Sequence, residues 1–143
     1  MIDFDLQAAE RLYFEAQLHF GGGDFRKADE TAYKAMLQAA RGLVRTQFQD
    51  IGDQPDRIIA EFRGRFVDTG LFRDKYAGTK FAEYLFRRHE DTKRDFNRDH
   101  ARHLLEEAQL FIEGAHACNA GMIERAAAAK PKPGRTPATP APA

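Results

Sequence analysis

Residues 21–44 decide the fold of this chain, and they read GGGDFRKADETAYKAMLQAARGLV. Apolar side chains recur there every three or four residues, which is the period of an amphipathic helix. Three glycines end any helix that precedes them, and Asp24 offers a carboxylate oxygen as the next N-cap. The pattern predicts a long helix that extends to about Phe48. Its apolar face is formed by Ala28, Ala32, Met36, Ala40, Leu43 and Val44.

A second helix is predicted before the glycines, from about Asp3 to Phe20. Its apolar residues recur every four positions. Two helices joined by three residues must pack antiparallel, as a helical hairpin. The predicted stripe consists of Phe4, Ala8, Leu12, Ala16 and Phe20.

Three more helices are predicted further along the chain, over residues 54–70, 79–89 and 97–121. Pro55 stands at the first helical position of one, Thr79 can cap the next, and Asn97 or Asp99 can cap the last. We therefore expect an all-α protein, a five-helix up-and-down bundle without a β-strand. The second and last helices should share one core, formed by Ala32, Met36, Ala40, Leu105, Ala108 and Ile112.

The C-terminal end has a different composition. Residues 126–143 read AAAAKPKPGRTPATPAPA and hold five of the six prolines. Proline blocks helix formation, and no large apolar side chain is left to bury there. We expect a disordered tail or linker after one domain that covers residues 1–125.

Composition excludes several classes of protein. The 22 basic and 22 acidic residues cancel, which excludes a histone-like chain. Cys118 is the single cysteine, so neither an internal disulfide nor a multi-cysteine metal site is possible. No stretch is long and apolar enough for a membrane span, and the first residues do not resemble a secretory signal. We expect a cytoplasmic protein without contact to membranes.

Charge is unevenly distributed along the chain. Residues 1–56 carry six basic and ten acidic residues, a net charge of −4. Residues 57–103 carry twelve basic and eight acidic residues, a net charge of +4. This basic middle segment could bind an anion such as RNA or a nucleotide, or it could be a solvated helix face. The residues expected to contact an anion are Arg87, Arg88, Arg94, Arg98 and His100.

The order of four stretches, at residues 20–44, 61–72, 86–92 and 100–115, resembles the HEPN family of small all-α domains. Arg87 and Asp91 match the arginine and aspartate of the family's Arg-x-x-Ala-Asp-Tyr stretch, although Glu90 and Thr92 replace its alanine and tyrosine. The last helix shows the family's Ala-x-x-Phe-Ile pattern at residues 108–112. The resemblance implies a homodimer, and it extends more weakly to helical extensions of some bacterial nitrite/sulfite reductases.

Many HEPN proteins are ribonucleases with an arginine, a polar residue and a histidine at the spacing of Arg98, Asp99 and His103. The histidine would take the proton of the 2′-hydroxyl, and the arginine would hold the scissile phosphate. Chance also explains one such match in a chain rich in arginine and histidine. A second candidate, a metal site of His100, His103 and Glu107, fits a solvated helix face better, and we expect no metal or other cofactor.

Three functions therefore remain open. The favoured one is a non-catalytic HEPN-like interaction module that binds RNA, a nucleotide or a partner protein. The second is a metal-independent ribonuclease that uses Arg98 and His103. The third is a helical accessory domain of a nitrite/sulfite reductase.

Overall fold

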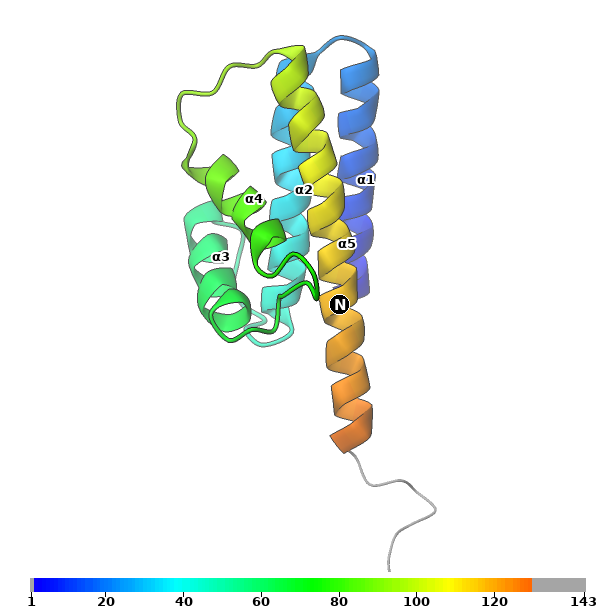
Figure 1. Ribbon diagram of the computed structural model, residues 1–143, viewed down its shortest axis with the longest axis vertical. Helices are drawn as coiled ribbons and strands as arrows, with labels where there is room; N and C mark the ends of the chain where they lie inside the picture. Colours follow the sequence, from blue (N-terminus) through cyan, green and yellow to red (C-terminus); the bar gives the residue numbers. More distant parts are fainter. Residues whose placement is uncertain (1, 130–143) are drawn as a thin grey trace, which may run out of the picture.

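The computed structural model describes residues 2–129, and within them it contains five α-helices and no β-strand (Figure 1). The predicted all-α, five-helix fold is therefore confirmed. The three long helices α1, α2 and α5 lie side by side, and the short helices α3 and α4 pack beside α2 and α5. The elements are α1 (Ile2–Gly21), α2 (Phe25–Arg45), α3 (Pro55–Phe62) with a π-helical turn η1 (Arg63–Val67), α4 (Lys80–Glu90) and α5 (Arg98–Ala129).

The predicted hairpin of α1 and α2 is present, and the two helices run antiparallel (Figure 1). Gly23 has a positive φ of 84°, a conformation that glycine adopts without steric cost. The Asp24 carboxylate accepts a hydrogen bond of 3.1 Å from the Lys27 amide, as an N-cap does. At the other junction Asn97 is the cap of α5, because its side chain accepts a hydrogen bond of 2.9 Å from the His100 amide.

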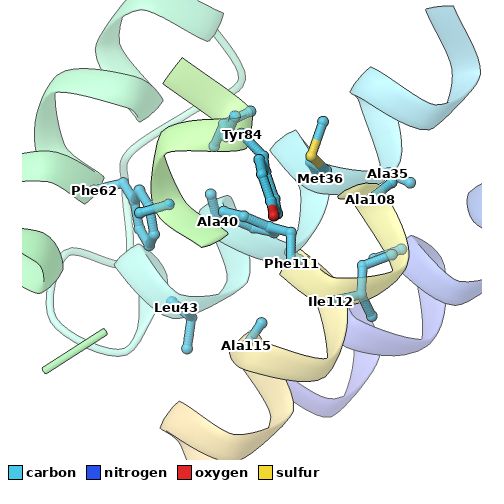
Figure 2. Close-up of a cluster of buried hydrophobic side chains, with 14 of the residues drawn as sticks. Ala35, Met36, Ala40, Leu43, Phe62, Tyr84, Ala108, Phe111, Ile112 and Ala115 are labelled. Carbon is cyan, nitrogen blue, oxygen red and sulfur yellow. The ribbon is translucent and has the colours of Figure 1, made fainter. Parts of the chain in front are cut away.

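The core lies where α2 and α5 meet the short helices (Figure 2). Phe111 of α5 is completely buried, and its ring centroid lies 5.6 Å from that of Phe62 in α3 and 5.2 Å from that of Phe72. The expectation of a shared core between the second and last helices is confirmed. All six predicted residues are buried, namely Ala32, Met36, Ala40, Leu105, Ala108 and Ile112.

The predicted core face of the first helix was partly wrong. Ala16 is buried as expected, but Phe4 is 61% exposed. Positions four residues apart drift by about 40° per step around a helix with 3.6 residues per turn, so five of them cannot all face one core. The buried face of α1 instead contains Asp5, Leu6, Ala9 and Ala16.

Three helix ends also differ from the prediction. α2 ends at Arg45 rather than near Phe48, and α3 passes into η1 at Arg63 instead of continuing to Gly70. α5 continues past Gly121 through Ala129, because one glycine inside a helix costs only about 1 kcal/mol and alanine is the best helix former. Residues 126–129 are therefore helical, and the rest of the predicted tail lies outside the described residues. None of the described helices could cross a membrane.

A buried carboxylate holds α1 against α2. Asp5 is completely buried and accepts hydrogen bonds from Gln38 at 2.7 Å and from Arg45 at 3.1 Å, with Arg41 at 3.6 Å. Gly42 makes this approach possible, because a Cβ atom at that position would lie 2.5 Å from the Asp5 Cβ. The two helices thus approach each other closely at a position where α2 has no side chain.

Candidate functional site

A cavity of about 250 Å³ lies between α4, the segment that follows it and the first turns of α5. Its wall contains most of the basic residues that the sequence singled out. Four of the five residues expected to contact an anion meet here, and His103 of the predicted catalytic set joins them. The basic residues around the cavity are Arg87, Arg88, Arg94, His100 and His103.

Two of these arginines share one carboxylate partner, Asp29 of α2, whose side chain is completely buried. Arg88 Nε donates a hydrogen bond of 2.8 Å to one carboxylate oxygen, and Arg94 Nε donates one of 2.5 Å to the other. Arg94 also lies 3.2 Å from the Asp91 carboxylate. Both guanidinium groups are therefore held in place by carboxylates, and little of their charge remains for a ligand.

Arg87, His100 and His103 are the exposed basic groups of the cavity, and the His100 ring already contacts the Asp95 carbonyl at 2.9 Å. The Arg87 side chain is 64% exposed, its guanidinium carbon lies 5.4 Å from the centroid of the Tyr84 ring, and its Nη2 is 4.0 Å from the Glu107 carboxylate. Burial raises the pKa of Glu107, although the charges of Arg87, Arg94 and His103 oppose this shift. A weakly paired arginine beside an exposed histidine is the part of the cavity that could contact an anion.

The structure separates Arg98 from His103. Arg98 does not line the cavity, and its guanidinium carbon lies 5.5 Å from the centroid of the Phe20 ring at the end of α1. Asp99 is exposed and faces Arg102 at 3.9 Å. Residues five apart on a helix point about 140° away from each other. Within one chain, Arg98 therefore cannot hold the phosphate that the 2′-hydroxyl attacks while His103 takes the proton of that hydroxyl.

The sequence did not indicate a chain of polar groups beside the cavity. Tyr33 Oη lies 2.7 Å from His89 Nδ1, and His89 Nε2 lies 2.7 Å from the Asp56 carboxylate. Burial raises the pKa of the Tyr33 phenol, the Asp56 charge raises it further, and the nearby Arg88 charge lowers it. The three residues belong to α2, α4 and α3, so these contacts connect three helices.

The outer face of α1 carries a row of exposed residues at alternating spacings of three and four. This is the heptad spacing of a helix seam that packs against another helix. Phe4, Phe14 and Leu18 are each about 60% exposed, which is unusual for side chains of this size. This row, the α1 seam, consists of Phe4, Gln7, Arg11, Phe14 and Leu18.

The described residues contain no group of three or more His, Cys, Asp or Glu side chains that could hold a metal ion. His116, the histidine nearest the C-terminal end of α5, lies 2.5 Å from the Glu10 carboxylate of α1. Comparison with known proteins found no matching family model, no similar curated protein and no similar solved structure. Function must therefore be argued from the geometry of this chain.

Proposed function

We propose that the protein is a non-catalytic, HEPN-like interaction module that pairs with a second copy of itself through the α1 seam. The exposed apolar row on α1 is the observation that supports this function. A monomer would leave two phenylalanines and a leucine in water on one helix face. The separation of Arg98 from His103 is the reason to prefer binding to catalysis.

The α1 seam is complementary to itself in an antiparallel arrangement. If the two-fold axis crosses the seam midway between Gln7 and Arg11, Phe4 lies opposite the partner's Phe14, and Gln7 lies opposite the partner's Arg11. The aromatic pairs then enclose the polar pairs, in which the arginine donates to the glutamine amide oxygen. An antiparallel pair buries the same patch on both copies, as a closed two-fold dimer requires.

Light scattering at tens of micromolar tests this proposal. The native chain should have twice the chain mass of 16.2 kDa, and Phe14→Glu should have the monomer mass because it buries a charge in the seam. Ile123→Glu is the matched control, since Ile123 is also 60% exposed but lies on α5. A monomeric native chain, or dissociation by Ile123→Glu to the same extent, would disprove the seam.

Anion binding at the cavity between α4 and α5 is a second candidate function. The convergence of three arginines and two histidines favours it. We expect a ten-nucleotide single-stranded RNA to bind weakly through Arg87 and His103. If two phosphates are neutralised, the affinity should fall about sevenfold between 50 and 200 mM salt.

The variant Arg87→Gln/His103→Gln should weaken RNA binding while leaving Asp29 and its two arginines intact. Arg98→Gln is the control, because Arg98 lies outside the cavity. Equal binding by both variants and the native chain would remove this candidate and leave protein pairing alone. The same RNA, recovered without cleavage, would also argue against a ribonuclease.

A further inference from the structure

A second cavity, of about 280 Å³, lies between the segment of residues 71–75 and the C-terminal half of α5. Its floor is apolar and includes Phe72, Phe81 and Cys118. Small residues on α5 leave this space open. A Cβ atom at Gly114 would lie 3.1 Å from the Phe72 ring, so the α5 backbone itself forms part of the wall.

The edge of this cavity is positively charged. Arg73, Lys75 and Arg125 line it, and none of them forms an ion pair within residues 2–129. The arginines of the first cavity, in contrast, lie on buried or partly exposed carboxylates. Three cations that have no ion-pair partner within residues 2–129 therefore meet at the second cavity.

Within residues 2–129, Asp74 is the only carboxylate that lines this cavity, and backbone amides hold it. Its Oδ2 accepts hydrogen bonds from the amides of Tyr76 at 2.8 Å and Ala77 at 2.7 Å. The turn is closed by reciprocal backbone hydrogen bonds between Asp74 and Gly78, of 2.8 and 3.0 Å. In this hydrogen-bonded turn, Arg73 and Lys75 flank a carboxylate that already has two donors.

The floor remains uncharged at neutral pH. Burial raises the pKa of the Cys118 thiol to about 11, although the Arg125 charge lowers it. The thiol instead donates a hydrogen bond of 3.4 Å to the Leu71 carbonyl. A ligand in this cavity would meet neutral apolar groups at the bottom and cations at the opening.

We propose that this cavity binds a small organic anion, with its apolar body on the floor and its phosphate or carboxylate group among Arg73, Lys75 and Arg125. A cavity of about 150 Å³ holds a benzene molecule, so this one has room for a ring with an anionic substituent. Exposed cations alone hold an anion only weakly in water, so the apolar body is needed for affinity. This site is separate from the α1 seam and from the cavity between α4 and α5.

The proposal is tested by adding each probe to the protein and monitoring the NMR signals of the Gly114 and Gly121 amides. Phenyl phosphate and benzoate distinguish the two anionic groups, while inorganic phosphate and phenol each supply one half of the ligand. We expect one of the two aromatic anions to bind at least ten times more tightly than either half. Equal affinity for the aromatic anion and inorganic phosphate, or no shift with any probe, would overturn the proposal.

Two kinds of variant locate the binding. Arg73→Gln/Arg125→Gln should weaken aromatic-anion binding at least tenfold, and Arg57→Gln/Arg102→Gln removes the same charge from elsewhere on the surface and should leave it unchanged. Ala117→Leu fills the cavity from an exposed helix position and should abolish binding without disturbing the core. Binding that survives Ala117→Leu, or that both double variants weaken equally, would place the anion outside this cavity.

Discussion

Replacement of Asp29 by asparagine should destabilise the protein more than any other conservative change at a charged residue of α2. Asparagine has nearly the same volume, so the change creates no cavity. It removes the negative charge that faces Arg88 and Arg94, and its amide group cannot accept from both guanidinium groups as the carboxylate does. The variant thus isolates the ionic contribution from packing.

The expected loss follows from the contacts. Hydrogen bonds to charged groups contribute about 1.5–3 kcal/mol each, so two of them give about 3–6 kcal/mol. The arginine side chains are 12% and 16% exposed, so water replaces part of what they lose. We therefore expect a loss near the lower end, about 3 kcal/mol, as is typical when one partner of a buried ion pair is removed.

Urea unfolding measures this loss, and the midpoint should fall by about 1 M or more. Asp99→Asn is the control, because Asp99 is exposed and its pair with Arg102 should contribute less than about 1 kcal/mol. A double-mutant cycle with Arg88→Gln should show a coupling of at least about 1 kcal/mol. Equal midpoints for Asp29→Asn and Asp99→Asn would refute the structural role of this ion pair.

Three further predictions concern packing and the thiol. Gly42→Ala should cost about 1–3 kcal/mol in urea unfolding because its Cβ would meet Asp5, whereas Gly64→Ala, with no atom within 4 Å of its Cβ, should change stability little. Met36→Ala should cost about 2–5 kcal/mol, and a change within about 0.5 kcal/mol would contradict its burial. The rate of maleimide addition to Cys118 should rise about tenfold per pH unit through pH 9.5, because the pKa is about 11; a plateau near pH 9 would contradict this value.

The helices could be predicted because each one repeats its apolar residues at the helical period and begins at a recognisable residue. Asp24 and Asn97 act as caps, and Pro55 begins α3. The rotation of a helix about its own axis could not be predicted in the same way. Whether Phe4 faces the core or the solvent depends on where α2 and α5 lie, and the sequence of α1 alone does not contain that information.

The candidate site could be predicted only in part. Residues 87–103 are close in sequence, so a turn between two helices brings most of their basic side chains to one cavity. Asp29 precedes them by about sixty residues, and no local pattern connects it with Arg88. One signal was present, since Asp29 is a charged residue beside the apolar face of α2, and a charge in such a position requires a partner.

The opposite charges of the first and middle segments are, in large part, a consequence of the fold. Asp29 of the acidic segment forms ion pairs with Arg88 and Arg94 of the basic segment, and the Asp56 carboxylate contacts the His89 ring. An excess of +4 in residues 57–103 therefore overstates the positive charge that a ligand can meet. The cations that remain without a carboxylate partner in residues 2–129 include Arg73 and Lys75. Of the two cavities, the one between the 71–75 segment and α5 is therefore lined by cations without a carboxylate partner in residues 2–129, whereas Arg87, Arg88 and Arg94 of the other each have one.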